Sequence, residues 1–166
     1  MTTTRGVLYI HSAQSAMCPH VEWAVAGVLG VSVNFDWTPQ PAAPSQWRAE
    51  LSWQGERGTA ALLASALRGW NQLRYEVTEE PVAGHEGARY SCTPTLGMFH
   101  AVIGVHGDIM ISEDRLRAAL LRTADTDDCE LHDELHLMLG QPWDDELEPF
   151  RYAGDGAPVR WLHQVG

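Results

Sequence analysis

GVLYIHSAQSAMCPHVEWAVAGVLG, residues 6–30, places a strand pattern directly before a helix pattern. The run GVLYIH (6–11) is rich in aliphatic and aromatic residues, which is typical of a β-strand. Pro19 suits the first turn of a helix, because the N–H that proline lacks would have no helical partner there. From Val21 onward apolar residues recur at helical spacing, and Gly30 marks the end of the helix. This stretch therefore predicts a β-α unit.

The patterns that follow complete a larger unit. VSVNFDW (31–37) and WRAELSW (47–53) alternate apolar and polar residues, as half-buried strands do. Residues 59–70 have helical spacing, and LRYEVTEE (73–80) has the composition of a strand. The order β-α-β-β-α-β is that of a ferredoxin-like α+β fold, an antiparallel sheet with two helices on one face. We expect this arrangement over residues 1–83.

The remainder, residues 84–166, is expected to form an acidic extension packed on that half, so that 1–166 is a single domain. HGD (106–108) predicts a tight hairpin turn. Ser112 and Asp127 are each followed by acidic residues, which predicts a helix N-cap at both positions. The extension is thus predicted to contain a C-terminal hairpin followed by helices.

The overall charge excludes several classes of function. The chain has 22 acidic and 11 basic residues, a formal net charge of −11, and every basic residue is arginine. Without lysine there is neither a Schiff base nor a Walker A loop, and no cofactor is expected. An acidic surface repels phosphate groups and anionic lipid, so neither nucleic-acid nor membrane binding is expected. Three cysteines, an odd number, do not resemble a disulfide framework, so reduced thiols are expected. With no leader-like segment and no apolar run long enough to span a bilayer, we expect a cytoplasmic location.

Cys18 is the first candidate for a catalytic residue. A thiol at a helix N-terminus has its anion favoured by the helix dipole, and the nearby His20 would lower its pKa further. Thioredoxin-like oxidoreductases use this geometry, and SCTPTLGMF (91–99) resembles their proline-containing strand. However, Val21 occupies the position of their second cysteine, so that only a one-cysteine mechanism remains, thiol exchange or acyl transfer. A small buried or capping Cys18 is the favoured interpretation.

Cys129, His132 and His136 are candidates for a metal site. Their spacing of i, i+3 and i+7 places all three on one face of a helix, and helical His-x-x-x-His pairs bind zinc. The glutamate that metalloprotease helices carry after the first histidine is replaced by Asp133. An acidic helix with solvated histidines is favoured over a zinc site.

Trp143, Leu147 and Phe150 form an aromatic stripe within PWDDELEPFRY (142–152). Exposed, such a helix would anchor the chain in the groove of a partner. Packing on the chain's own core is the favoured alternative. VRWLHQV (159–165) follows as a last strand or docked tail.

Five strings, four of which contain tryptophan, make the chain resemble a known group of proteins. These strings are CPHVEWA (18–24), ASALRGW (64–70), FHAVIGVHGDI (99–109), PWDDELEPFRYAG (142–154) and APVRWLHQV (157–165). Across its whole length the chain resembles a family of actinobacterial proteins of about this size that carries only a domain-of-unknown-function label. The resemblance implies no established activity and no site residues. Genes of some members lie beside fatty-acid synthesis genes, which implies an accessory role around acyl carrier proteins or their enzymes.

These observations favour a cytoplasmic, non-enzymatic binding or regulatory protein. It would engage a protein partner or a small ligand, or assemble as a homo-oligomer. The missing catalytic motifs, the absent lysines and the aromatic-rich acidic tail support this hypothesis. The alternatives are a thiol enzyme that uses Cys18 and a zinc protein that uses Cys129, His132 and His136.

Overall fold

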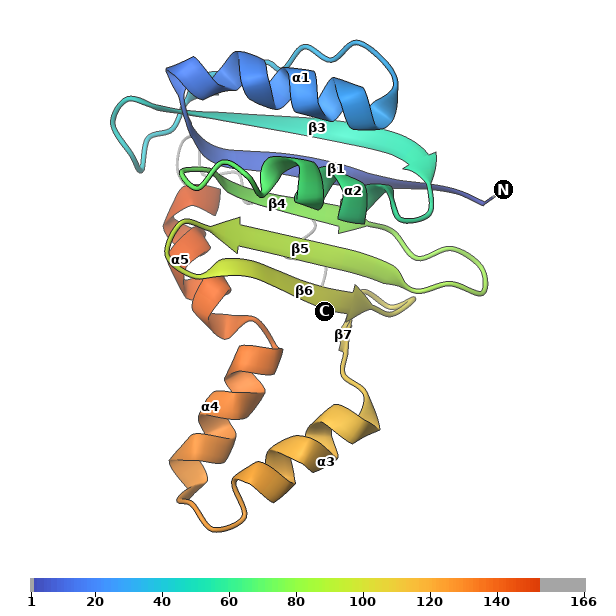
Figure 1. Ribbon diagram of the computed structural model, residues 1–166, viewed down its shortest axis with the longest axis vertical. Coiled ribbons are helices and arrows are strands. Elements are labelled where there is room, and N and C mark those ends of the chain that lie inside the picture. Colours follow the sequence, from blue (N-terminus) through green and yellow to red (C-terminus); the bar gives the residue numbers. More distant parts are fainter. Residues whose placement is uncertain (1, 153–166) are drawn as a thin grey trace.

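A seven-stranded antiparallel sheet in the order β2-β3-β1-β4-β5-β6-β7 is the framework of the molecule, which is therefore an α+β protein (Figure 1). The computed structural model describes residues 2–152. The strands are β1 (Thr3–Gln14), β2 (Thr38–Pro39), β3 (Gln46–Glu56), β4 (Arg74–Glu79), β5 (Gly87–Thr93), β6 (Gly97–Ile103) and β7 (Ile109–Met110). The helices are η1 (Ser15–Met17), α1 (Cys18–Leu29), α2 (Thr59–Leu67), α3 (Glu113–Arg122), α4 (Asp128–Met138) and α5 (Gln141–Arg151).

β1 organises the first half of the sheet. It pairs antiparallel with β3 on one side and with β4 on the other, so that β3 and β4 run parallel with β1 between them. Side chains alternate between the two faces of each strand, and Leu8, Ile10, Tyr75 and Val77 point to one face. They form a single core with buried side chains of the two helices that cover this face, Val21, Val25, Leu63 and Leu67.

The predicted β-α unit at the start of the chain is confirmed. α1 begins at Cys18 with Pro19 in its first turn. It ends at Gly30, which adopts φ 71° and donates its N–H to the carbonyl oxygen of Ala26 at 2.8 Å. This left-handed conformation is one that glycine adopts without steric cost. The predicted strands at 47–53 and 73–80 and the helix at 59–70 are also present, as β3, β4 and α2.

The predicted strand at 31–37 is wrong, because this segment has no regular secondary structure. One acceptor on α1 holds it instead: Glu22 Oε1 accepts a bond from the Phe35 N–H at 3.1 Å and from Trp37 Nε1 at 2.9 Å. The prolines after residue 37 limit ladder formation further, and β2 is only two residues long. The strand order therefore does not show the ferredoxin-like topology.

The second half of the chain continues the same sheet. β5 pairs with β4 over five residue pairs and with β6 over seven. The predicted hairpin at 106–108 is confirmed, since the Gly104 N–H bonds to the carbonyl oxygen of Asp108 at 2.9 Å and β6 pairs with β7. The division of the chain after residue 83 stays a prediction.

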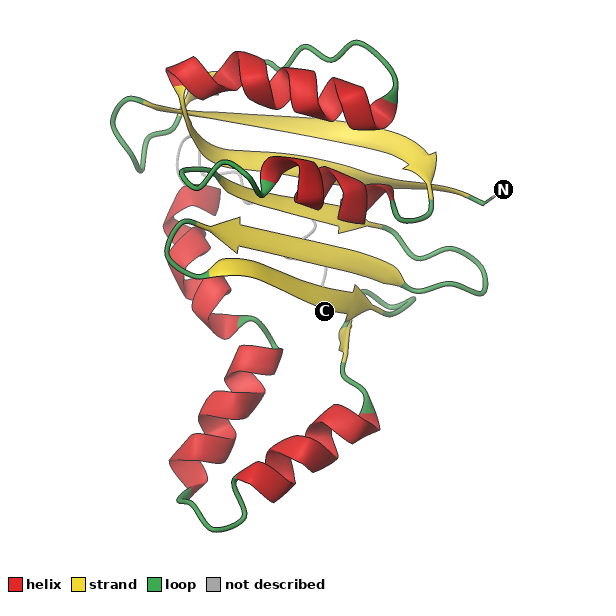
Figure 2. Cartoon of the chain, viewed as in Figure 1, coloured by secondary structure: helices red, strands yellow, loops and turns green. Residues whose placement is uncertain are grey.

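α3 and α4 form a helical arm that lies beyond β6 and β7, apart from α1 and α2 (Figures 1 and 2). Both predicted N-caps are confirmed: Ser112 Oγ accepts from the Arg115 N–H, and Asp127 Oδ1 from the Glu130 N–H, each at 3.3 Å. From the arm the chain turns into α5, which lies against the face of the sheet opposite α1 and α2. No helix in residues 2–152 is long and apolar enough to cross a membrane.

Candidate functional site

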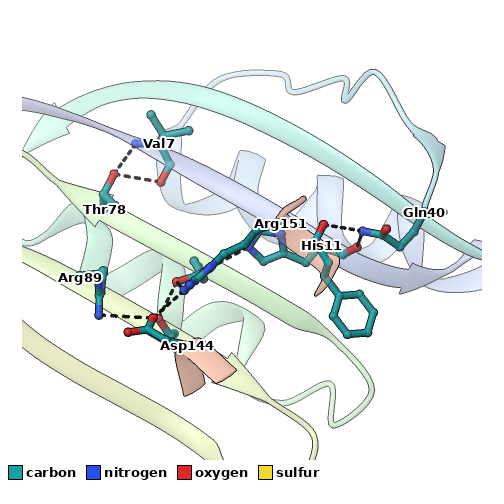
Figure 3. A network of polar contacts seen from close by, with 10 residues as sticks. Val7, His11, Gln40, Thr78, Arg89, Asp144 and Arg151 are labelled. Atoms are coloured by element: carbon teal, nitrogen blue, oxygen red, sulfur yellow. Dashed lines mark hydrogen bonds and ion pairs between the residues drawn. The ribbon is translucent and has the colours of Figure 1, made fainter. Parts of the chain in front are cut away.

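The most deeply buried ionisable group of the described chain is the carboxylate of Glu76 on β4. It points to the face opposite α1 and α2, because Tyr75 and Val77 on either side of it point toward those helices. Its two oxygens accept four hydrogen bonds, from His11 Nε2 at 2.9 Å, Ser91 Oγ at 2.7 Å, and Arg151 Nε and Nη2 at 2.7 Å each. We call these four residues the Glu76 cluster; Figure 3 shows Arg151 beside His11.

In the Glu76 cluster, the ionised forms of Glu76 and Arg151 stabilise each other. Burial acts to raise the pKa of Glu76, but the hydrogen bond from His11 and the charge of Arg151 together lower it well below its usual range. Burial likewise disfavours the charged Arg151, but Glu76 and then Asp144 raise its pKa. Because an ionised carboxylate only accepts hydrogen bonds, His11 Nε2 carries a hydrogen.

α5 is attached to the sheet along its whole length. Near its start, Trp143 Nε1 donates to the carbonyl oxygen of Gly97 at 3.0 Å. At its end, Arg151 reaches Glu76 and also bonds to Asp144 Oδ1 at 3.0 Å, which Arg89 approaches to 3.8 Å (Figure 3). Through these contacts the Glu76 cluster holds the C-terminal end of α5 on the sheet.

The Glu76 cluster has no vacant position for chemistry. An ionised carboxylate offers about four lone-pair sites, and all of those of Glu76 are taken by protein donors. Gln40 adds a further tie, because its amide donates to the carbonyl oxygens of His11 at 2.7 Å and Phe150 at 3.3 Å. We therefore assign the cluster a structural role.

The structure separates Cys18 from His20. Cys18 is buried and its Sγ donates to the carbonyl oxygen of Gln14 at 3.6 Å, whereas His20 is exposed and lies near Trp70. Burial, and then the charge of Glu22, raise the pKa of the Cys18 thiol, the opposite of what a nucleophilic thiol needs. Residue 94, the proline of the thioredoxin-like comparison, lies in the turn between β5 and β6.

The three candidate metal ligands of α4 do not converge on one point. The rings of His132 and His136 lie with their centroids 4.1 Å apart and are tilted by 32°, and Cys129 is exposed. Within the described part of the chain, no three His, Cys, Asp or Glu side chains lie close enough together to hold a metal ion.

The aromatic stripe of α5 packs on the chain's own sheet. Leu147 is fully buried and Trp143 nearly so, with the Trp143 ring centroid 5.1 Å from that of Phe99 on β6. Phe150 is half-buried, and the guanidinium of Arg74 lies 4.6 Å from its ring centroid. These side chains are occupied by intramolecular contacts. The predicted tail at 159–165 lies outside the described residues.

A groove of about 420 Å³ separates β6 from the arm. Its polar lining comes from both sides, with His100 on β6, Arg115 and Arg122 on α3, and Glu134 on α4. The apolar lining is Met98, Phe99, Ala118, Leu137, Met138 and Trp143. We call this space the arm groove. It was not predicted from the sequence, because its lining residues come from four elements, β6, α3, α4 and α5. The turn around Gly140 sets how α4 and α5 follow one another.

The arm groove carries an unpaired positive charge. Arg122 is paired with Glu134 at 2.7 Å, but the guanidinium of Arg115 has no hydrogen bond or ion pair to any of residues 2–152. Burial, and then the charge of Arg115, lower the pKa of His100, which keeps that ring neutral near pH 7. With Arg115, Arg122 and Glu134 in its lining, the groove carries one more positive than negative charge in a protein of net charge −11.

Comparison with known proteins identifies a family but no activity. No curated protein and no solved structure matches the chain. A family model described as a protein of unknown function, DUF3145, matches residues 7–164. The expected membership of a domain-of-unknown-function family is thus confirmed, and the chain belongs to the DUF3145 family.

Proposed function

We propose that this protein is a non-enzymatic binding protein that engages a protein partner through the arm groove. The observation that carries the proposal is the arm itself, which stands off the sheet (Figure 1). Its side chains line a groove together with those of β6.

The two side chains best suited to catalysis, Glu76 and Cys18, are buried and hydrogen-bonded within the protein. The carboxylate of Glu76 is saturated by His11, Ser91 and Arg151. The Cys18 thiol is buried, and its pKa is raised. Neither arrangement supports acid–base or nucleophilic chemistry. Binding is therefore better supported than a thiol enzyme.

The surface beside the arm groove favours a protein partner over a small ligand. The arm exposes leucines on both helices, Leu116, Leu120, Leu121 and Leu137, and Leu139 follows directly after α4. Leu120 and Leu121 are 55% and 79% exposed, and covering one leucine side chain contributes about 2 kcal/mol to association. Leu137 lines the arm groove and the other four leucines lie elsewhere on the arm, and exposed apolar area of this kind is typical of an interaction surface.

The remaining parts of the functional hypothesis are included in this proposal. We expect the protein to act in the cytoplasm. The accessory role around acyl carrier proteins, implied by the family resemblance, also stays a prediction. A second copy of this chain is the alternative partner for the same surface. Measuring the mass in solution distinguishes such a homo-oligomer from a complex with a different protein.

A paired capture experiment tests the proposal. The full chain is immobilised and exposed to native lysate of its source organism, in parallel with Ala118→Glu, which fills the arm groove, and Leu62→Glu on the exposed side of α2. We expect a stoichiometric partner with the wild type and Leu62→Glu, and its loss with Ala118→Glu. No stoichiometric partner with the wild type, or equal capture by all three, would contradict the proposal. Circular dichroism checks that each variant is folded.

A further inference from the structure

We infer that the arm groove binds an extended acidic segment of the partner, which adds to the sheet as a strand beside β6. The inference rests on the proposed function and specifies the mode of binding and the chemistry of the partner. It is carried by the open edge of β6, the position of the arm and the charge of Arg115.

The outer edge of β6 is open over most of its length. β7 pairs only with Val102 and Ile103, and in residues 2–152 no other strand pairs with β6 on that side. The Gly104 N–H bonds to Asp108 across this edge. In an antiparallel ladder, every second residue directs its N–H and C=O to the same side. Counting back from Gly104 through Val102, the backbone N–H and C=O of His100 face the open edge.

The arm groove lies where an added strand would run. A new strand lies about 4.8 Å from its neighbour, and the four residues 98–101 offer it about 13 Å of edge. The arm groove occupies the space beside this edge, and the arm residues Arg115, Ala118 and Leu137 form its other wall. The arm would therefore cover the far side of the strand, as strand-addition sites require pockets for side chains as well as a backbone partner.

The two faces of the edge differ in chemistry, which predicts an alternating segment. The side chain of His100 lies on one face, close to Arg115, whereas Phe99 points to the opposite face and packs against Trp143. Because successive side chains of a strand alternate, acidic residues would face Arg115 and apolar residues would face Trp143.

The charge pattern also explains why the other edge of the sheet is not equivalent. β2 covers only Trp47 and Arg48 on the outer edge of β3, so the rest of that edge, opposite β1, also lacks a strand partner in the described chain. That edge carries Glu50 and Glu56, whose charges repel an acidic segment. The unpaired Arg115 directs such a segment to β6.

Defined peptides test this inference by fluorescence anisotropy with the full chain. The probe is a dye-labelled octapeptide, Thr-Val-Glu-Val-Glu-Val-Glu-Thr, and the comparison peptide has lysine in place of glutamate. We expect the acidic peptide to bind at least about tenfold more tightly than the basic one. Arg115→Ser should weaken the acidic peptide about fivefold. Equal binding of both peptides would overturn the assignment of an acidic partner.

Backbone changes test strand addition separately from charge. Two further peptides carry N-methyl groups on alternate residues, in one register or the other; only one register should abolish binding, because only alternate amides face β6. On the protein side, His100→Pro removes the edge N–H and should abolish binding, whereas His100→Ala keeps this N–H and should retain binding. Binding that survives both methylated registers would overturn strand addition and indicate that side-chain contacts alone hold the peptide.

The inference and the proposed function can fail independently. If no peptide binds, but lysate capture is lost with Ala118→Glu, the arm groove remains a binding surface and the acidic-strand inference is wrong. If capture fails as well, the proposed function is also wrong.

Discussion

Glu76→Gln is expected to lower the free energy of unfolding by about 3 kcal/mol. The side chain is 0% exposed, and Arg151 donates two of the four hydrogen bonds to its carboxylate. Glutamine keeps the shape but removes the charge, so Arg151 loses its buried counterion and keeps its 3.0 Å contact with Asp144. Removing one partner of a buried ion pair costs about 3–5 kcal/mol. The lower end applies because Asp144 still compensates part of the charge.

Urea unfolding followed by tryptophan fluorescence measures this loss. With a slope of about 2 kcal/mol per molar urea, the midpoint should fall by about 1.5 M. Glu50→Gln is the matched control, since Glu50 is exposed on β3, and it should change the free energy of unfolding by less than about 0.5 kcal/mol. If Glu76→Gln lowers the free energy of unfolding no more than the control does, the Glu76 cluster does not stabilise the packing of α5 on the sheet.

A double-mutant cycle shows whether the effect passes through Arg151. Arg151→Met alone leaves Glu76 with His11 and Ser91 as donors. Glu76→Gln combined with Arg151→Met should cost clearly less than the two single changes added together, because neither buried charge is then left unpaired. Additive costs would show that the two residues act independently.

Three further outcomes are expected. Leu147→Ala should lower the free energy of unfolding by about 2–4 kcal/mol in urea, because Leu147 is fully buried, whereas Leu121→Ala on the exposed arm should change it by less than about 0.5 kcal/mol. Iodoacetamide should label Cys129 rapidly and Cys18 only after unfolding, since Cys129 is exposed and burial raises the pKa of Cys18; rapid native labelling of Cys18 would restore the thiol-enzyme hypothesis. Below about pH 4, acid should destabilise the wild type more steeply than Glu76→Gln. The pKa of Glu76 is lower in the folded than in the unfolded state, so the stability that its carboxylate contributes is present above the unfolded-state pKa and is lost as the pH falls toward the folded-state pKa. Parallel profiles of unfolding free energy against pH for the two proteins would count against this.

The first 30 residues were predictable because their signals are local. Pro19 lies in the first turn of α1, and Gly30 ends the helix with a positive φ, as their residue types indicate. The error at 31–37 has an equally specific cause. Alternation predicts a strand only if another strand is available to pair with it, and here the Glu22 side chain supplies the hydrogen bonds instead.

The Glu76 cluster could not be predicted from local patterns. In LRYEVTEE, Glu76 alternates with Tyr75 and Val77, which is typical of a solvent-facing position on a half-buried strand. Its partner Arg151 is 75 residues away in the chain, so no spacing rule connects them.

The arm groove could not be predicted from local patterns either. Its shape depends on Gly140, which joins α4 to α5 with φ 75°. A side chain there would place its Cβ 2.5 Å from Phe99 Cε1, so glycine permits both the turn and the close approach to β6. A glycine between two helices can be recognised in the sequence, but the strand that it contacts cannot.

Amide hydrogen exchange at His100 tests the open edge of β6 most directly. Ala101, paired with Arg89 on β5, provides the reference within the same strand. In the free protein the His100 amide should exchange at least about tenfold faster than that of Ala101, because its N–H points to the open edge of β6 and not toward β5. Saturation with the acidic octapeptide should slow His100 and leave Ala101 unchanged. A His100 amide that is already protected in the free protein, or one that the peptide does not slow, would contradict strand addition at β6.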